Sequence, residues 1–592
     1  MIWSNLNKLC SDKIKSSSYG VKKIIVDNKE YNDYNNIVEL FNDYFCSIGP
    51  KLSAKIPSTS VDPKSFLGNT QINSFFCEST NQYEICEIVK SMKKSSSYAG
   101  DLISINIVKT CADVLSIPLA YIYNLSLQQG LFPDRMKISK VIPLFKKGDS
   151  SILSNYRPIS LTSPFSKILE KIVHKRLTSF FAKFNVLYEY QFGFRKNFST
   201  NLALIEVINM LDNELFNKKL VMGIFLDLQK AFDTVNIDIL LQKLEHYGVR
   251  GHMLRWFSSY LKDRKQMTVN LNACSKINFT TCGVPQGTVL GPLLFLVYIN
   301  DIGLATDNNK IRLFADDSNI FITANDADSL FKSANEIVDK LYNWLIVNKL
   351  SINIDKTNYM IFKPNNNLNK IIDSRHLTLK IGSSIISRIS ETKYLGIVID
   401  DNLTWCNHIS TLISKVSSMI GIMYKRRHLL PVSCIKNVYF SLIHSVLIYG
   451  IEIYGNASYC HLKPLITKCN TLLRVLQFSN KSTKVVDLYK KYHTLPIDSL
   501  FHYYILKLMH RCLHDNSGLP KVINNLFTIN TSIHDHNTRS HSDFHLSNSI
   551  DKNSLAFLGP KLWSKLPQVI KEVSSQNNFL NLVKNHLTCL IG

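Results

Sequence analysis

The stretch "KIRLFADDSNIFITA" (residues 310–324) places two adjacent acids, Asp316 and Asp317, between two apolar runs. The apolar runs predict the strands of a β-hairpin with the acids at its tip. Neighbouring carboxylates repel each other and are costly to bury, so they persist only where water or cations neutralise them. The pair therefore indicates either a solvated turn or a cation site.

A third acid has a context that favours the cation site. The stretch "KKLVMGIFLDLQKAFDTV" (residues 218–235) predicts an apolar strand that ends at Asp227. If this strand lies beside the hairpin, carboxylates gather at one edge of a sheet. Hard divalent ions such as Mg²⁺ prefer carboxylate oxygens and substrate phosphates. Two such ions can stabilise the attacking and leaving oxygens of phosphoryl transfer.

Two further segments favour chemistry on phosphates. "CGVPQGTVLGPLLFLVYIND" (residues 282–301) places several glycines before an apolar helix, and clustered glycine lets the backbone approach a ligand closely. "VIPLFKKGDSSILSNYRPISL" (residues 141–161) supplies cations, of which the arginine suits bidentate phosphate contact. For the lysines, an ordinary solvated surface is the alternative. The candidate ligand-contacting residues are Lys146, Lys147, Arg157, Gln286 and Gly287.

Composition limits the class of protein. The 592 residues are 45% hydrophobic, which excludes bulk disorder, and they carry a formal net charge of +24. This charge indicates a polyanionic partner, most simply nucleic acid; a basic protein kept soluble by its charge is the alternative. The 13 cysteines form no Cys-x-x-Cys pair, which predicts reduced thiols and an intracellular location, nucleus or cytoplasm. No signal peptide or bilayer-length apolar stretch is visible, so no membrane partner is expected.

Apolar periodicity predicts helices at both ends of the chain and an α/β middle. The stretch at residues 35–52 has apolar residues at helical spacing and predicts a helix that stops near Gly49-Pro50. A helix over residues 237–248 is expected to be capped by Asp238 and ended by Gly248. Further helices are predicted within residues 82–130, over 165–181 and over 408–430, and the segment from about Lys481 is predicted to be mixed.

Seven segments of the chain form an ordered series. They combine the three aspartates with the glycine-rich and cationic stretches, and they span roughly residues 131–401. In order they are "NYRPISL" (155–161), "QFGFRKNFST" (191–200), "FLDLQKAFDTV" (225–235), "GVPQGTVLGPLLFLVYIND" (283–301), "FADDSNIF" (314–321), "LSINIDKTNYMIF" (350–362) and "YLGIVID" (394–400).

This series resembles the reverse transcriptases of non-LTR, or LINE-type, retrotransposons, near the jockey-like branch. The resemblance implies an α+β, right-hand polymerase of fingers, palm and thumb. It implies four regions. These are a helical N-terminal linker and fingers extension (1–125), fingers and palm (126–401), a helical thumb (402–480) and a C-terminal region of unknown role (481–592).

The same resemblance implies roles for individual residues. Asp227, Asp316 and Asp317 match the palm aspartates that hold two Mg²⁺ or Mn²⁺ ions. Phe232 matches the aromatic gate that excludes a ribose 2′-hydroxyl, with a core aromatic as its alternative. Lys356 matches a lysine that protonates the leaving pyrophosphate, with a solvated lysine as its alternative. Lys146, Lys147 and Arg157 would hold the triphosphate, and Gln286 and Gly287 would lie beside the nucleotide and template.

The implied function is RNA-directed DNA synthesis on template RNA from a DNA primer, with deoxynucleoside triphosphates as substrates. Members of the family commonly carry an endonuclease before the polymerase, and the residues before the first polymerase segment are too few for one, so no nicking activity is expected. A catalytically inactive, nucleic-acid-binding relic is the alternative. An RNA-templated RNA polymerase is disfavoured by the bulk of Phe232. The four histidines at 534, 536, 541 and 545 are expected to lie in a polar loop, a metal site being the alternative.

Overall fold

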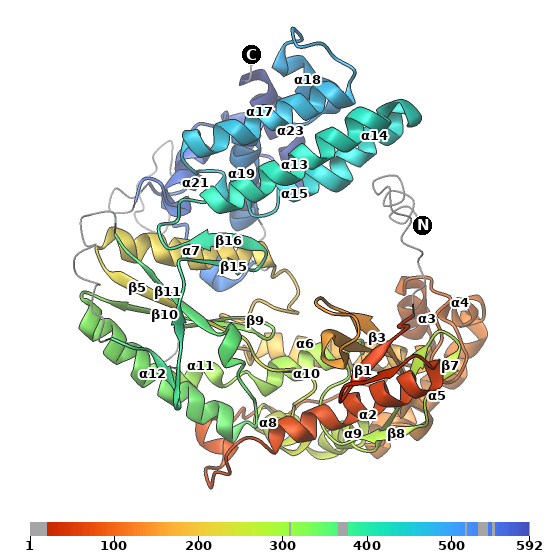
Figure 1. Ribbon diagram of the computed structural model, residues 1–592. Coiled ribbons are helices and arrows are strands. Elements are labelled where there is room, and N and C mark those ends of the chain that lie inside the picture. The colour runs from red at the N-terminus through yellow and green to blue at the C-terminus, as the bar shows by residue number, and fades with distance from the viewer. Residues whose placement is uncertain are drawn as a thin grey trace.

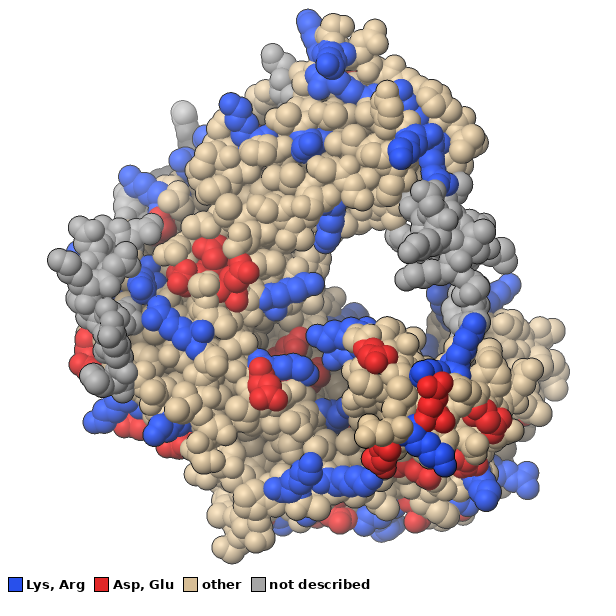
Figure 2. All heavy atoms as spheres, viewed as in Figure 1, with Lys and Arg blue, Asp and Glu red and all other residues tan. Residues whose placement is uncertain are grey.

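The computed structural model describes residues 20–306, 310–364, 377–514, 518–530, 543–546 and 551–590. Within these residues the chain is a mixed α and β protein (Figure 1), and the space-filling view shows that it curves around an open hollow (Figure 2). A small sheet with the N-terminal helices forms one arm, a larger sheet forms the middle, and helices form the other arm. Lys and Arg side chains appear on both arms around this hollow (Figure 2).

The larger sheet has five strands, in the spatial order β14 (Ser387–Arg388), β11 (Asn358–Phe362), β5 (Leu220–Leu226), β10 (Asp317–Ala324) and β9 (Ile311–Phe314). The central strand β5 is apolar and buried throughout, as its sequence predicts. β10 pairs antiparallel with both β5 and β9. The hairpin predicted at residues 310–324 is therefore confirmed, and it lies beside the strand that ends at Asp227.

Side chains of β5 alternate between two hydrophobic cores, because successive residues of a strand point to opposite faces. Met222 and Ile224 belong to one core, whereas Val221 and Phe225 belong to the other. Helix α7 (Thr200–Phe216) and the helical arm cover the second core. The first core is covered by α6 (Pro164–Lys183), α8 (Ile237–His246), α9 (Gly251–Leu261), α10 (Gly291–Tyr298), α11 (Ile302–Ala305) and α12 (Ala327–Val347).

The second sheet also has five strands, and we call it the smaller sheet because fewer of its residues are paired. It joins β4 (Tyr156–Leu161), β3 (Ile138–Phe145), β6 (Arg264–Asn270) and β7 (Ala273–Cys274), with β8 (Asn278–Thr280) also paired to β6. Helix α2 (Tyr34–Ser53) packs on this sheet. The buried Asn42 of α2 donates to the Lys276 carbonyl at 2.9 Å and accepts from Gln266 at 3.2 Å. These buried hydrogen bonds fix the N-terminal helix to the sheet.

The other N-terminal elements surround this arm and contribute to the first core or to a small third core. The helices predicted within residues 82–130 and over 165–181 are confirmed. The elements are β1 (Ile24–Val26), β2 (Lys29–Tyr31), η1 (Pro63–Phe66), α3 (Gln82–Ser91), α4 (Ile105–Thr110), α5 (Ala112–Gln129), η2 (Asp134–Lys137) and η3 (Leu153–Asn155).

Two predicted helix boundaries are wrong. Helix α2 continues through Pro50 to Ser53, because a proline in the last turn removes only one helical hydrogen bond. Helix α8 is capped by Asn236, whose side chain accepts from the Ile239 N–H at 3.0 Å, and not by Asp238. Asp238 lies in the first turn and forms an ion pair with Lys262 at 2.9 Å. The predicted glycine end is confirmed, since Gly248 follows the helix with φ of 98°.

The segment between the larger sheet and the helical arm contains short strands. Asp400, the last residue of strand β16, accepts hydrogen bonds from the backbone N–H groups of Thr404 at 2.9 Å and of Trp405 at 3.0 Å. These bonds fix the connection to the first long helix of the arm. The elements are η4 (Ile354–Lys356), β12 (Lys380–Ile381), β13 (Ser384–Ile385), β15 (Glu391–Tyr394) and β16 (Ile397–Asp400).

The helical arm begins at Cys406, which confirms the helix predicted over 408–430. After Lys481 the assigned elements of the described residues are helices, so the mixed character predicted there is wrong apart from an isolated antiparallel β-bridge between Ile529 and Phe544. Apolar residues spaced three or four apart, such as Ile497, Leu500 and Phe501, bury one side of each helix. The elements are α13 (Cys406–Arg426), η6 (Arg427–Leu429), α14 (Val432–Val438), η7 (Tyr439–His444), α15 (Ser445–Leu447), α16 (Ile451–Tyr454), α17 (Tyr459–Leu476), α18 (Val485–Tyr492), α19 (Ile497–His514), α20 (Lys521–Asn524), α21 (Leu555–Ser564), α22 (Gln568–Lys571) and α23 (Gln576–Leu590).

Candidate active site

Three aspartates meet where neighbouring strands of the larger sheet end. Asp227 directly follows β5, Asp316 lies in the turn before β10, and Asp317 is the first residue of β10. The last paired position of the two strands is Ser318 opposite Leu226, so the next residue on each strand is an aspartate. The carboxyls are within electrostatic reach of one another, because Asp316 and Asp227 both raise the pKa of Asp317.

Contacts from a distant segment hold the turn that carries Asp316. Ala315 has a left-handed φ of 56°, which costs energy for a residue with a side chain. The buried Gln191 Oε1 accepts from the N–H of Ala315 at 3.0 Å and of Gly193 at 2.8 Å. A Cβ atom on Gly193 would lie 2.3 Å from the Ala315 nitrogen, so only glycine fits there. No local sequence pattern indicates this supporting role, although Gln191 and Gly193 lie in one of the seven segments of the ordered series.

The pKa values of the hairpin carboxyls are raised. Burial raises the pKa of Asp316, and the charge of Asp227 adds to this effect. The Asp317 side chain is itself exposed, yet desolvation by the surrounding protein, followed by the charges of Asp316 and Asp227, raises its pKa to about 6. In both cases burial disfavours the ionised form, and a bound cation would favour it.

Basic side chains from the smaller sheet and from η4 face these carboxyls. The Lys356 Nζ lies 3.3 Å from the Asp227 Oδ2. Arg157 on β4 and Lys146 just after β3 lower the pKa of Asp316 and of Asp317, in opposition to burial. Lys147 is exposed beside Lys146 and contributes, after burial and the other nearby charges, to lowering the pKa of that lysine.

Lys230 is a further cation at this site, which the sequence analysis missed. Its Nζ donates to the carbonyls of Ser154 at 3.1 Å and Tyr156 at 3.2 Å. Burial lowers the pKa of Lys230, and the charges of Lys146 and Arg157 add to the effect. Lys230 thus links the segment after β5 to strand β4. Its position three residues after Asp227 was the available signal.

Phe232 and the glycine-rich loop lie together beside this segment. The half-buried Phe232 ring stacks on Phe295 with centroids 4.3 Å apart and meets Phe194 edge-on at 6.2 Å. The Gln286 carbonyl accepts from the Ser160 N–H of β4 at 2.7 Å. Gly287 has φ of 113°, and a Cβ there would lie 2.6 Å from the Ser160 oxygen. The loop therefore packs directly on the smaller sheet.

The donor chemistry of the three aspartates fits a hard divalent cation, because carboxylate oxygens are the ligands that Mg²⁺ prefers. The raised pKa values of Asp316 and Asp317 are consistent with such a site. Across the described residues, however, no three His, Cys, Asp or Glu side chains are already grouped as a metal site. Lys356 pairs with the Asp227 carboxylate in this arrangement.

The other metal candidate, the histidine-rich segment, falls largely outside the described residues. His534, His536 and His541 are not among them, and the His545 Nδ1 lies 3.2 Å from the Asn530 Oδ1. The cysteines in the described part of the chain are all free. In the same residues, no helix combines the length and apolar character needed to cross a membrane.

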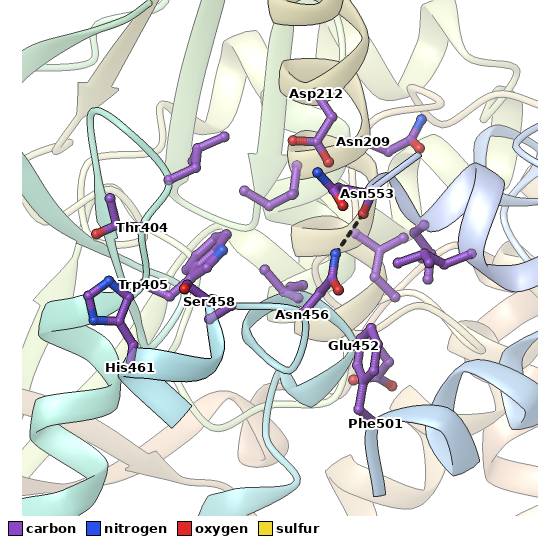
Figure 3. Close-up of a pocket in the computed structure, with 17 residues that line it drawn as sticks. Asn209, Asp212, Thr404, Trp405, Glu452, Asn456, Ser458, His461, Phe501 and Asn553 are labelled. Carbon is purple, nitrogen blue, oxygen red and sulfur yellow. Dashed lines mark hydrogen bonds between the residues drawn. The ribbon is translucent and has the colours of Figure 1, made fainter. Parts of the chain in front are cut away.

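A second group of carboxyls lines a cavity of about 460 Å³ between α7, the start of α13, α16 and α21 (Figure 3). Burial, then the charge of Asp551, raises the pKa of Asp212 to about 7. Burial raises the pKa of Glu452 to about 7, and its carboxylate accepts from Asn201 at 2.8 Å. Trp405 also lines the cavity. None of the candidate site residues from the sequence lies here.

Comparison with known proteins places the aspartate site inside a recognised domain. A family model described as "Reverse transcriptase (RNA-dependent DNA polymerase)" matches residues 145–399. The RNA-directed DNA polymerase from mobile element jockey of Drosophila funebris is 28% identical over 395 residues, which cover 64% of this chain and 42% of that protein. The probable RNA-directed DNA polymerase from transposon BS of Drosophila melanogaster is 28% identical over 414 residues, covering 66% and 44%. The chain thus spans less than half the length of these curated relatives.

Proposed function

Residues 145–399 are a reverse transcriptase domain homologous to those of jockey-type non-LTR retrotransposons, and from this premise we propose that the chain copies RNA into DNA. The observation that carries the proposal is the position of Asp227, Asp316 and Asp317 at one edge of the larger sheet, inside the matched domain. Template RNA, primer DNA and deoxynucleoside triphosphates are the proposed partners, met in the nucleus or cytoplasm.

We assign the parts of a right-hand polymerase to the described elements. The larger sheet, with α7 and α12, corresponds to the palm, and the smaller sheet, with the N-terminal helices, to the fingers. The helical arm from Cys406 to about residue 480 corresponds to the thumb, and the role of residues 481–592 stays open. The hollow between the arms, with Lys and Arg on its rim, suits a template–primer duplex held through its phosphates (Figure 2).

Reverse transcriptases as a family use divalent metal ions. We propose that Asp227 and Asp316, supported by Asp317, hold two such ions, either Mg²⁺ or Mn²⁺. When bound, these ions would neutralise charge on the primer 3′-oxygen and on the pyrophosphate. The chain's own contribution is to hold the carboxylates in position, through the β5–β10 register and through Gln191 under the turn.

Basic residues would bind and orient the triphosphate. Arg157 on β4 and Lys146 just after β3 act electrostatically on Asp317, and with the adjacent Lys147 they would balance the phosphate charge. Lys356 would hold a proton at its Nζ for the leaving pyrophosphate. It would be released for this role when Asp227, its ion-pair partner, binds a metal ion instead. Catalysis of this kind depends mainly on positioning and electrostatic stabilisation.

Phe232 would select the sugar. One face of its ring rests on Phe295, which supports the ring against displacement, while the side chain remains partly exposed. A rigid ring beside the sugar would clash with a ribose 2′-hydroxyl and admit a deoxyribose. Gln286 and Gly287 would lie next to the nucleotide and template, on a loop held by Ser160.

A primer-extension assay tests the proposal. Purified protein is given an RNA template, a DNA primer, deoxynucleoside triphosphates and Mg²⁺ or Mn²⁺, with a chelator as the matched control. We expect metal-dependent DNA products of template length. Nucleic-acid binding without extension, under either metal, would instead support a catalytically inactive, nucleic-acid-binding relic.

A further inference from the structure

A hydrogen bond joins two segments of the candidate active site that are 53 residues apart in sequence. The Gln286 Nε2 donates to the Asp233 Oδ1 at 2.9 Å, in a partly buried position. Asp233 directly follows Phe232, and Gln286 lies in the glycine-rich loop. The bond therefore connects the aromatic residue proposed as the sugar gate to the loop proposed to lie beside the nucleotide.

Backbone contacts hold these two segments in a single arrangement. The Val284 N–H donates to the Phe232 carbonyl at 2.8 Å, and the Gly283 N–H donates to the Val235 carbonyl at 2.8 Å. Gly283 has φ of 85°, and a Cβ there would lie 3.0 Å from the Asp233 oxygen. The Asp233 backbone is therefore fixed against the loop, which leaves its side chain little choice of direction.

The N-terminal helix closes the other side of Asp233. A Cβ on Gly49 of α2 would lie 2.4 Å from the Asp233 carbonyl oxygen. The Cys282 thiol donates to the same carbonyl at 3.4 Å. The backbone amide of Asp233 is also engaged, donating to the Lys230 carbonyl at 2.8 Å. The backbone of Asp233 is thus held by contacts from three segments. Its side-chain carboxylate is the group that accepts the hydrogen bond from Gln286.

An ionised carboxylate only accepts hydrogen bonds, whereas the two ends of a glutamine amide differ, one donating and the other accepting. Asp233 therefore selects the amide orientation in which Nε2 is engaged and Oε1 remains for a ligand. Burial raises the pKa of Asp233 to about 6, while Gln286, Lys230 and Arg157 oppose the rise, so the carboxylate is ionised at neutral pH. The orientation of the amide is thus defined under physiological conditions.

We infer that Asp233 is a positioning residue that presents the Gln286 Oε1 as a hydrogen-bond acceptor to the incoming deoxynucleotide. This inference rests on the proposed function, and it adds a residue that works only through another. The matching donors on a deoxynucleoside triphosphate are its 3′-hydroxyl and the amino groups of its base. Loss of the carboxylate should therefore weaken nucleotide binding more than it slows the chemical step.

Asp233→Asn is the direct test, because asparagine has the same shape but can donate as well as accept. Both amide orientations of Gln286 then become available, and the charge-assisted hydrogen bond is lost. We expect KM for deoxynucleotides to rise about tenfold with kcat within about twofold, an effect the size of one hydrogen bond. Asp238→Asn, at an exposed aspartate paired with Lys262, is the matched control and should leave both constants unchanged.

A double-mutant cycle separates positioning from general structural support. In a Gln286→Met background there is no amide to orient, so adding Asp233→Asn should change KM by less than about twofold. Independent, multiplying effects of the two substitutions would overturn the inference, as would a fall in kcat with KM unchanged. Equal melting temperatures of the variants would exclude misfolding as the cause.

A binding measurement keeps the test independent of turnover. The affinity for a deoxynucleotide is measured on a template–primer whose primer ends in a dideoxynucleotide. The four proteins compared are the wild type, Asp233→Asn, Gln286→Met and the double variant. If the wild-type protein binds the nucleotide but never extends a primer, the proposed function fails while the affinity comparison still tests Asp233. Wild-type protein that binds no nucleotide would overturn both.

Discussion

Two regions of the molecule carry carboxyls with raised pKa values, and their neighbours differ. At the edge of the larger sheet, Asp316 and Asp317 face Lys146 and Arg157, with Lys356 paired to Asp227. In the cavity at the base of the helical arm, Asp212 and Glu452 form no ion pair in the described part of the chain (Figure 3). Burial is the main cause of the raised pKa in both regions.

The comparison shows that a raised carboxyl pKa does not by itself identify a catalytic group. At the sheet edge, three acids and several cations lie together, which is a surface suited to metal ions and phosphates. In the cavity, the carboxyls lie among apolar side chains such as Trp405 and uncharged polar ones such as Asn209 and Asn456, and desolvation is the largest cause of the raised pKa values. The two regions should therefore respond in opposite ways to loss of a carboxylate.

The largest expected effect is on catalysis at the sheet edge. Asp316→Asn should reduce primer extension by roughly 10³-fold, because a carboxylate proposed to hold metal is lost, while gel-shift affinity for the template–primer stays nearly the same. Asp212→Asn is the matched control in the cavity and should leave extension within about twofold. Extension at wild-type rate by the Asp316 variant would remove the basis for the two-metal assignment.

The cations around the aspartates give the second test. Lys356→Gln should lower kcat by about 10²-fold, because the proposed proton donor for the leaving pyrophosphate is removed. Single-turnover rates measure this step without product release. The exposed Lys332 on α12 offers a control, since Lys332→Gln removes the same charge away from the site. Unaltered kcat in the Lys356 variant would mean that this lysine only neutralises Asp227.

The aromatic residues of the two regions give a smaller effect. Phe232→Val should raise ribonucleotide incorporation relative to deoxynucleotides by about tenfold, because it removes the ring proposed to clash with the 2′-hydroxyl. Trp405→Phe, in the cavity, keeps a ring and should not change the ratio. The ratio of ribonucleotide to deoxynucleotide incorporation is measured by letting both nucleotides compete on one template. An equal ratio in both variants would identify Phe232 as a core aromatic.

The smallest expected effect is on stability and belongs to the cavity. The pKa of Asp212, about 7, exceeds the value near 4 of an unfolded aspartate. Between these values the folded state keeps a proton that the unfolded state loses, so stability falls as pH rises through this window and stays lowered above it. Asp212→Asn should therefore stabilise the protein at pH 8 by about 2 kcal/mol and have little effect at pH 4.

Thermal unfolding of both proteins at the two pH values measures this difference. Asp238→Asn, at an exposed aspartate, should change the melting temperature little at either pH. A lower melting temperature of the Asp212 variant at pH 8 would show that its carboxylate makes an interaction the fold needs.

Local patterns predicted much of the fold. The hairpin at 310–324, the apolar strand before Asp227 and the helix over 408–430 are confirmed, because apolar periodicity and strand length act over a few residues. The cap of α8 and the character of the chain after Lys481 were mispredicted. In each case the local signal was ambiguous, since Asn236 and Asp238 are both capping residues and short apolar runs suit either strand or helix.

The sequence by itself indicated the candidate residues for the proposed chemistry: the three aspartates, the cations that follow β3 and lie in β4, and the glycine-rich loop. It did so because these residue types stand in short segments whose local structure is strongly biased. Only the tertiary structure decided how they are held. Gln191 lies under the turn 124 residues further on, Lys356 pairs with an aspartate 129 residues before it, and Asp233 accepts from Gln286 across 53 residues. Hydrogen bonds over such separations depend on the packing of whole elements, which no local pattern in the chain specifies.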